Sequence, residues 1–213
     1  MPESLKIDMH VHSDKSPDAL ASIEELVAEA KRKGLSGIAL CDHNYIHKTK
    51  PKFDGVIVLY GCEVSSTQGH IAVFGVDEIP TREPEDLCDY VNNEGGLAIP
   101  THPFSLHKKG VGNLAFTLGP VIEKFNGTDP INNMLSRLKL KNGTGGSDAH
   151  HPAELGLAWT EFKSVESEDD VLEALRKGKF SGHVSHNPFK LPLAFSKRIF
   201  RRIVRRKQFI PKA

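Results

Sequence analysis

Long apolar runs, a strong net charge and an even set of cysteines are all missing from this chain of 213 residues. No apolar stretch approaches the roughly 20 residues that a transmembrane helix needs. The N-terminus has no basic region followed by an apolar run, as a secretory signal would have. The formal net charge is only +1, which provides no global field for nucleic acid. These absences predict a cytoplasmic protein without a transmembrane segment, whose partners are recognised by local features.

The three cysteines do not predict a disulfide framework, because their number is odd. Cys41 and Cys62 lie inside apolar strings, directly before Asp42 and Glu63. Such a thiol behaves as a small apolar core residue, and it stays reduced in the cytoplasm. We therefore expect buried structural cysteines, not nucleophiles or metal ligands.

Short apolar runs alternate with stretches of helical period over most of the chain. The pattern predicts strands at 5–9, 37–41, 56–60, 71–76, 97–99, 121–125, 143–146 and 158–162, and helices at 22–33, 83–93, 131–141 and 167–177. Repeated β-α units favour parallel pairing and a closed or nearly closed barrel. The length favours a single α/β domain, which we expect to occupy residues 1–185.

A basic amphipathic helix is predicted in the remaining segment, 186–213. Its apolar residues recur at helical spacing, and basic residues fill the positions between them: Phe195, Ile199, Phe200, Ile203 and Val204 against Lys197, Arg198, Arg201, Arg202, Arg205, Arg206 and Lys207. Docking of the apolar stripe on the barrel is the default interpretation. The alternatives are contact with nucleic acid or with an anionic surface through the basic helix at 195–207.

Histidine and acidic residues recur where the predicted strands end. Nine of them are candidate metal ligands: His10, His12, Asp18, His43, Glu63, His70, His102, Asp148 and His150. Side chains at positions i and i+2 of a strand share one face, so His10 and His12 can bind the same ion. In β/α barrels the active groups lie at the C-terminal ends of several strands, which predicts one shared site. A mixed shell of imidazole and carboxylate suits Mn, Zn or Fe better than Ca.

Five strings carry these residues: Asp8-Met9-His10-Val11-His12-Ser13, Cys41-Asp42-His43-Asn44, Gly61-Cys62-Glu63-Val64-Ser65, Thr101-His102-Pro103 and Gly145-Gly146-Ser147-Asp148-Ala149-His150. In this order they resemble the motifs of the PHP family, named for polymerase and histidinol phosphatase domains, over residues 5–185. The resemblance implies a distorted (β/α)7 barrel with a trinuclear metal centre that hydrolyses phosphate esters. It assigns the first metal to His10, His12, Glu63 and Asp148, the second to Glu63, His70 and His102, and the third to Asp18, His43 and His150.

The expected chemistry is hydrolysis by water that two or three divalent metal ions activate. Two close ions lower the pKa of a shared water and neutralise charge on the attacked phosphate. We expect Asp8, Asp42, Glu63 and His150 to carry the catalytic work. Asp8 and Asp42 are expected to orient ligating imidazoles or, as the less favoured alternative, to carry protons. Asn126 matches a motif of short PHP proteins, and we expect it to hydrogen-bond a ligand or the substrate.

Other polar residues near these motifs are less specific. His47, His107, His151, His183 and His186 fall outside the motifs and are expected to be surface or core imidazoles, with His47 and His186 as the first exceptions. The segment 104–118 carries His107, Lys108 and Lys109 beside a candidate ligand. It is either a lid whose cations meet phosphate or an ordinary solvated loop.

A small phosphomonoester is the favoured substrate, because no large insertion or second domain supplies a channel for a polynucleotide. The first alternative is a nuclease or nucleotide phosphodiesterase that uses the basic tail. The second is a binding module in which the metal only staples the fold.

Overall fold

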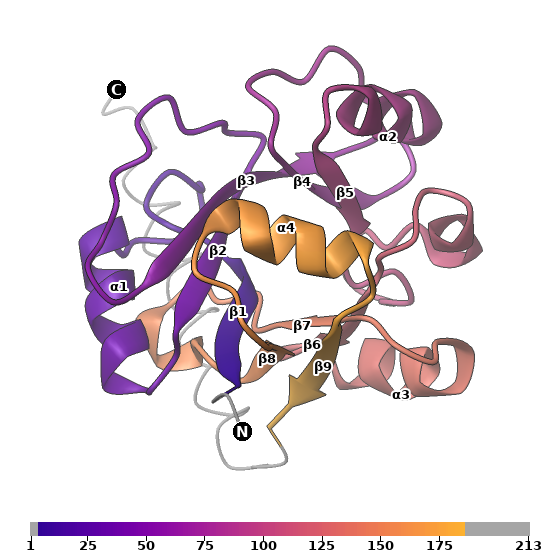
Figure 1. Ribbon diagram of the computed structural model, residues 1–213. Helices are drawn as coiled ribbons and strands as arrows, with labels where there is room; N and C mark the ends of the chain where they lie inside the picture. Colours follow the sequence, from indigo (N-terminus) through magenta and orange to yellow (C-terminus); the bar gives the residue numbers. More distant parts are fainter. Residues whose placement is uncertain (1–3, 186–213) are drawn as a thin grey trace, which may run out of the picture.

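Seven strands of the computed structural model, which describes residues 4–185, form one curled sheet (Figure 1). Their order is β5-β4-β3-β2-β1-β8-β9, with bounds β1 Leu5–Val11, β2 Gly37–His43, β3 Ile57–Ser65, β4 His70–Phe74, β5 Leu97–Pro100, β8 Ala158–Phe162 and β9 Phe180–Val184. The strands β6 (Glu123–Asn126) and β7 (Thr144–Gly146) form a separate parallel pair. Ala149, just after β7, bridges to Val11 at the end of β1, which brings this pair back to the main sheet.

Strand direction is mixed, so the parallel pairing favoured by the sequence pattern holds for only part of the sheet. The strands β1, β2 and β3 are parallel, but β4, β5, β8 and β9 join the sheet through antiparallel pairs. Only residues 66–69 separate β3 from β4. A parallel connection needs a crossover of about a dozen residues or more, whereas a short turn can join antiparallel strands. The fold is therefore mixed α/β with a curled half-barrel sheet.

Four α-helices accompany the strands in the described residues: α1 Ile23–Arg32, α2 Pro84–Asn93, α3 Pro130–Lys139 and α4 Glu168–Arg176. The predicted helices are thus confirmed within two residues at either end, but seven β-α units are not present in this part of the chain. The N-cap residue of α1 is Ser22, whose side chain accepts from the backbone N–H of Glu25, while the Glu25 side chain accepts from the backbone N–H of Ser22. Short 3-10 turns follow at η1 (Gly112–Phe116) and η2 (Pro152–Glu154).

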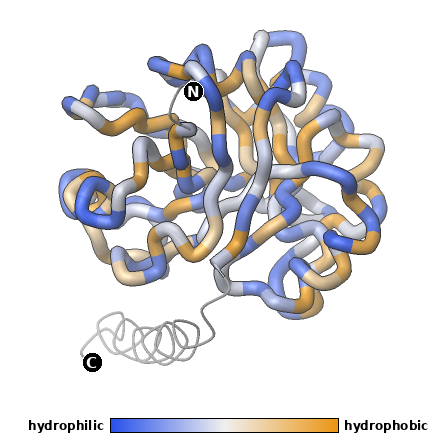
Figure 2. Tube along the Cα trace, turned by 60° about the horizontal axis from the view of Figure 1, so that its bottom comes forward, coloured by the Kyte–Doolittle hydropathy of each residue, from blue (hydrophilic) through white to orange (hydrophobic). Residues whose placement is uncertain are grey.

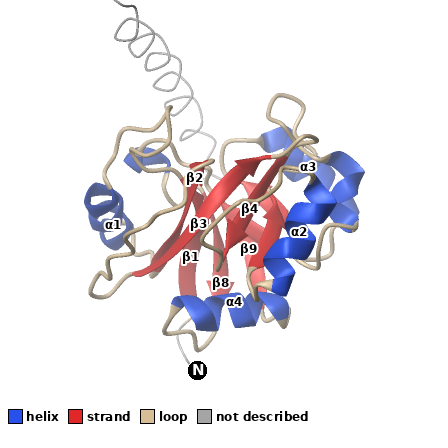
Figure 3. Ribbon diagram, turned by 90° about the horizontal axis from the view of Figure 1, so that it is seen from above, coloured by secondary structure: helices blue, strands red, loops and turns tan. Residues whose placement is uncertain are grey.

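Helix α4 fills the concave side of the sheet. Figure 1 shows it lying across the middle of the ring of strands. Its buried side chains Val171, Leu172 and Leu175 join a core that includes Ile7 and Phe162. Helices α1 and α2 contribute to two other apolar clusters, and Figure 3 shows them on opposite sides of the molecule. Figure 2 shows apolar residues gathered along the central strands and hydrophilic residues along the outer loops. This packing leaves the C-terminal ends of β1, β2 and β3 available for polar side chains.

Several strands differ from the sequence pattern, and β3 runs five residues beyond the expected range 56–60. Strand β9 was missed, because Ser181, Gly182 and His183 interrupt any apolar alternation in it. The strand expected at 121–125 begins two residues later, at Glu123. No helix within residues 4–185 has the length and apolar character needed to cross a bilayer. The predicted basic helix at 195–207 and the extension 186–213 lie outside the described residues.

Candidate metal centre

All nine candidate ligands meet at one end of the sheet. The parallel strands β1, β2 and β3 bring their C-terminal ends to the same edge, and His43 pairs with Glu63 in the register of β2 and β3. Strand β4 runs the other way, so its first residue, His70, lies at this edge opposite Ser65. His102 follows β5, and the segment after β7 brings Asp148 and His150 beside the end of β1. The expectation of one shared cluster is thus met by the fold, including at the antiparallel strand.

Glu63 is at the centre of this cluster. Its side chain is 1% exposed, and its two oxygens lie within 4 Å of five imidazoles. Oε1 is 3.4 Å from His10 Nε2, 3.4 Å from His70 Nδ1 and 3.2 Å from His102 Nε2. Oε2 is 3.0 Å from His43 Nδ1 and 3.7 Å from His12 Nε2. A carboxylate placed in this way can bridge two ions.

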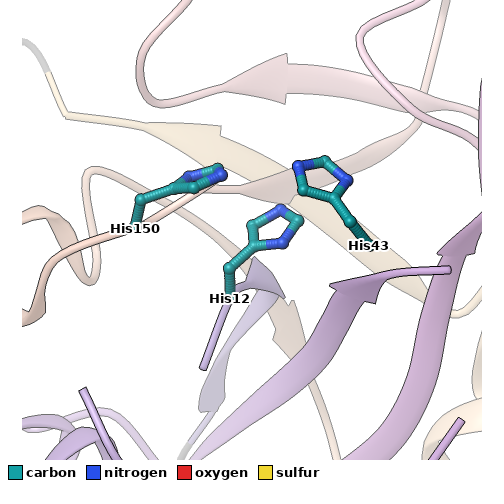
Figure 4. A group of neighbouring side chains, drawn as sticks. All are labelled: His12, His43 and His150. Atoms are coloured by element: carbon teal, nitrogen blue, oxygen red, sulfur yellow. The ribbon is translucent and has the colours of Figure 1, made fainter. Parts of the chain in front are cut away.

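Asp18 and Asp148 hold the opposite side of the cluster. Asp18 Oδ2 lies 3.2 Å from His150 Nε2, and Asp18 Oδ1 lies 3.7 Å from His43 Nε2. Asp148 Oδ1 lies 3.3 Å from His12 Nε2 and 3.4 Å from His150 Nδ1. The rings of His12, His43 and His150 converge in Figure 4, with centroids 4.4 Å apart for His12 and His43 and 4.1 Å apart for His12 and His150.

The distances between ligand atoms group the candidate residues differently from the metal assignment that the resemblance to the PHP family implies. Three sets have donor atoms within 4.8 Å of one another: His12 with His43 and His150, His10 with His12 and Glu63, and His43 with Glu63 and His70. His12 and His43 thus each belong to two sets, although the resemblance gives each to a single metal. The division of the nine residues among two or three ions stays a prediction.

The electrostatics of these residues fit a cation. Burial, together with the nearby His150 and His43, lowers the pKa of His12 to about 3, so its imidazole is neutral near pH 7 and keeps a lone pair. Burial by itself would raise the pKa of Glu63, but His10 and the other imidazoles lower it well below its usual range. Burial would lower the pKa of His10 and of His43, but Glu63 and other carboxylates raise both. Metal binding requires neutral imidazole and ionised carboxylate, so a metal ion would displace a proton from these two rings.

Unsatisfied polar atoms point to the same conclusion. Asp18 Oδ1, His70 Nδ1 and His102 Nδ1 are buried and have no hydrogen-bond partner within residues 4–185. A buried polar atom without a partner costs free energy comparable to a lost hydrogen bond. His10 Nε2 and His12 Nε2 also lie only 3.1 Å apart. A divalent cation would satisfy such donors, so the residues present fit a metal.

Asp42 supports a candidate ligand through a serine. It is fully buried and accepts hydrogen bonds from Ser13 and from Ser16 Oγ, at 2.8 Å for the latter, and pairs with His47 Nε2 at 2.7 Å. Ser16 Oγ also lies 3.0 Å from His12 Nδ1. Burial would raise the pKa of Asp42, but hydrogen bonds from His47 and the serines lower it to about 2. His47 is therefore a buried neighbour of the site.

Asp8 forms hydrogen bonds with the backbone of three other residues. Its carboxylate accepts from the N–H groups of His10, Ser147 and Gly156, at 3.3, 2.7 and 2.8 Å. Burial raises the pKa of Asp8 to about 6, although these hydrogen bonds oppose the change. The observed contacts tie β1 to the segment that carries Asp148, and they involve peptide groups instead of the expected imidazole.

Glu123 is a residue of the site that the motifs did not reveal. Its side chain is 3% exposed, and Oε1 lies 3.0 Å from His10 Nδ1. Oε2 accepts hydrogen bonds from the backbone N–H of His102 and from Asn126 Nδ2, the latter at 3.2 Å. Asn126 is fully buried and, within the described residues, meets the candidate ligands through Glu123 and Lys108. An acidic residue in the middle of the predicted strand 121–125 was the only available signal.

The segment 104–118 is packed against the site and is not a freely solvated loop. Phe104, Val111, Ala115 and Leu118 are buried in an apolar cluster. Lys108 Nζ donates hydrogen bonds to Asp148 Oδ2, to Asn126 Oδ1 and to Thr128 Oγ1. The remaining described histidines lie elsewhere: His107 near Asp129, His151 at the cap of η2, and His183 against Trp159.

The thiols follow the expectation for structural cysteines. Cys41, Cys62 and Cys88 are free and buried. Burial raises the pKa of Cys62 and of Cys88 to about 12. Neutral thiols of this kind are poor metal ligands and poor nucleophiles.

Comparison with known proteins supports the family. The model of the PHP domain matches residues 8–117, and a PHP-associated model matches residues 135–180. An uncharacterised protein of Methanocaldococcus jannaschii is 33% identical over 140 residues, which are 57% of this chain and 82% of that protein. A protein named "Probable phosphatase" from Caldicellulosiruptor saccharolyticus is 36% identical over 74 residues, only 29% of this chain and 31% of its own length.

Among solved structures, PsfC from Pseudomonas syringae PB-5123 superposes with a TM-score of 0.75 at 19% identity, covering 95% of this chain and 99% of PsfC. This likeness concerns the fold. The PHP-domain match covers more than half of the chain and includes seven of the nine candidate ligands, all but Asp148 and His150. The chain belongs to the PHP domain family.

Proposed function

We propose that this protein is a metal-dependent phosphoesterase that hydrolyses a small phosphomonoester. Membership of the PHP family, with proteins named "Probable phosphatase" among the relatives, supports a hydrolase acting on phosphate esters. The observation that carries the proposal is the convergence of six histidines and three carboxylates on one edge of the sheet, with Glu63 among five imidazoles.

His10, His12, Glu63 and Asp148 would hold one ion, Glu63, His70 and His102 a second, and Asp18, His43 and His150 a third. Bound divalent ions at such a site lower the pKa of water toward neutrality and stabilise negative charge on phosphate. The donor set favours Mn, Zn or Fe.

The chain's own groups prepare this site. The low pKa of His12 keeps its imidazole neutral, and Ser16, held by Asp42, fixes the orientation of the ring through Nδ1. Glu123 fixes the orientation of the His10 ring in the same way, through its contact with Nδ1. Such supporting contacts fix the tautomer and direction of an imidazole, and their loss typically lowers metal affinity or activity.

The proposal is tested by phosphate release from a mixed pool of phosphomonoesters, measured with protein reconstituted with Mn. The wild type is expected to release phosphate, and His150→Ala is expected to abolish release. His183→Ala serves as a matched control, because His183 lies on β9 and stacks on Trp159, away from the candidate ligands. If wild-type protein with verified metal content released no phosphate, the proposal of a phosphomonoesterase would be rejected.

The same protein preparation separates the alternatives. Cleavage of nucleotide diesters or polynucleotides without release from monoesters would favour the nuclease, and truncation before residue 195 should then weaken it. If truncation abolished cleavage of monoesters and diesters alike, the tail could no longer be used to distinguish the nuclease from the phosphomonoesterase. Metal binding without hydrolysis of either class would favour a metal-stapled binding module.

A further inference from the structure

Lys108 crosses the edge of the candidate metal centre to reach Asp148. Its side chain is 10% exposed, so the ammonium is largely withdrawn from water. Within residues 4–185 it is the only lysine or arginine paired with a candidate ligand. A buried ammonium is costly unless anionic or polar groups surround it. The position of this cation calls for a functional explanation.

The backbone around Lys108 is anchored to the other side of the site. His70 N–H donates to the carbonyl of Lys109 at 2.8 Å, which ties the segment to the start of β4. Phe104 N–H donates to Asn132 Oδ1 at 2.9 Å, close to where the segment leaves β5. The segment thus starts near His102, is held at His70 and extends its lysine to Asp148 after β7.

The two oxygens of Asp148 have different surroundings. Oδ1 faces the imidazoles of two candidate ligands, His12 and His150, at 3.3 and 3.4 Å. Oδ2 accepts from Lys108. The ammonium therefore lies one carboxylate away from the place where a cation would bind. Its other acceptors, Asn126 Oδ1 at 2.9 Å and Thr128 Oγ1 at 2.7 Å, are neutral.

We propose that Lys108 is the protein's own cation for the phosphate group of the substrate, and that it favours a terminal phosphate over a phosphodiester. This inference rests on the proposed function. A lysine ammonium has three donors, and here they meet Asp148, Asn126 and Thr128. If Asp148 shared its charge with a bound metal ion, its hold on the ammonium would weaken, and a phosphate oxygen could replace one of the three acceptors.

Charge explains the expected selectivity. A terminal phosphate carries nearly two negative charges near pH 7, whereas a phosphodiester carries one. An additional ammonium beside bound metal ions therefore stabilises the monoester more strongly than the diester. A cation on a flexible stem also suits phosphate without fixing the rest of the substrate.

Lys108→Met and Lys108→Arg test the assignment, with Lys109→Met as control. Lys109 is the exposed neighbour of equal charge, and its substitution leaves the backbone carbonyl that binds His70 in place. The probe is inorganic phosphate, titrated calorimetrically into Mn-loaded protein whose metal content has been measured. Hydrolysis of a monoester and of a diester is followed in parallel.

Lys108→Met is expected to raise the dissociation constant of phosphate about 10-fold to 100-fold, the loss typical of a hydrogen bond between charged groups. The KM for monoesters should rise with it, the diester should be affected less, and metal content should match wild type. Lys108→Arg should recover part of the phosphate affinity, and Lys109→Met should behave as wild type.

Unchanged phosphate affinity in metal-loaded Lys108→Met would overturn the assignment and leave the proposed function intact. Loss of bound metal from this variant would also overturn it, because Lys108 would then be a support for Asp148. If the wild type neither binds phosphate nor hydrolyses any ester, the inference fails together with the proposed function.

Discussion

Glu123 Oε1 lies 3.0 Å from His10 Nδ1, on the side of the imidazole that faces away from the other candidate ligands. The opposite ring nitrogen, Nε2, is 3.1 Å from His12 Nε2 and 3.4 Å from Glu63 Oε1. Since Glu123 also accepts a hydrogen bond from the backbone N–H of His102, one carboxylate supports a candidate ligand on β1 and another in the segment after β5.

Replacing Glu123 by Gln should weaken metal binding while the fold persists. The amide cannot accept at both positions, so the His10 tautomer and the His102 backbone lose part of their support. Outer contacts of this kind typically contribute about 10-fold to 100-fold in metal affinity. Competition with a metal indicator measures the change, and Glu166→Gln at an exposed position is the control. Wild-type affinity in Glu123→Gln would contradict a supporting role.

Replacing Gly146 by Ala should displace His10. A Cβ built on Gly146 would lie 2.6 Å from the His10 backbone nitrogen and closer still to the His10 Cβ, distances that real Cβ atoms essentially never show. We expect a lower melting temperature and loss of at least one bound metal per chain. Gly119→Ala is the matched control, because its Cβ would meet nothing nearer than a carbonyl oxygen at 3.6 Å. Equal melting temperatures and metal content for both variants would show that the contact can relax.

Much of this site could be anticipated from sequence, because its ligands follow short apolar runs that form strands. The motif residues come together at one edge even though the sheet is partly antiparallel, since an antiparallel strand that begins at this edge places its first residue, His70, there. Helix ends were predictable for a local reason: Ser22 and Ser167 cap their helices with side-chain hydrogen bonds a few residues away.

Contacts between distant segments could not be anticipated in this way. Strand direction depends on the length of a connection and on what the next strand can pair with. Glu123 and Lys108 carry no motif, and their partners His10 and Asp148 lie 113 and 40 residues away. Only the folded chain shows that the loop lysine reaches the metal-ligand cluster.

The three thiols should resist modification in the native protein. Burial raises the pKa of Cys62 and Cys88 to about 12, so at pH 8 their thiolate fraction is about a thousandfold lower than that of a free cysteine. Cys41 is also fully buried. Ellman's reagent should detect almost no thiol before denaturation and three per chain in guanidinium chloride. A fast-reacting thiol in the native state would show that one of these side chains is accessible.

Replacing Lys33 by Met should loosen the segment that follows His150. Lys33 Nζ donates to the carbonyl oxygens of Pro152, Ala153 and Leu155 at 3.1, 2.8 and 2.8 Å, joining the end of α1 to η2. Hydrogen bonds from a charged donor suggest a loss of about 1–3 kcal/mol in the free energy of unfolding, measured by urea denaturation. Lys31→Met, at an exposed position of the same helical turn, should change it by less than about 0.5 kcal/mol. The same segment also positions the backbone of His150, whose N–H donates to Glu154 at 2.8 Å. The Lys33 variant should therefore also have a lower affinity for the most weakly bound metal ion. Equal stability and metal affinity in both lysine variants would mean that η2 is held without Lys33.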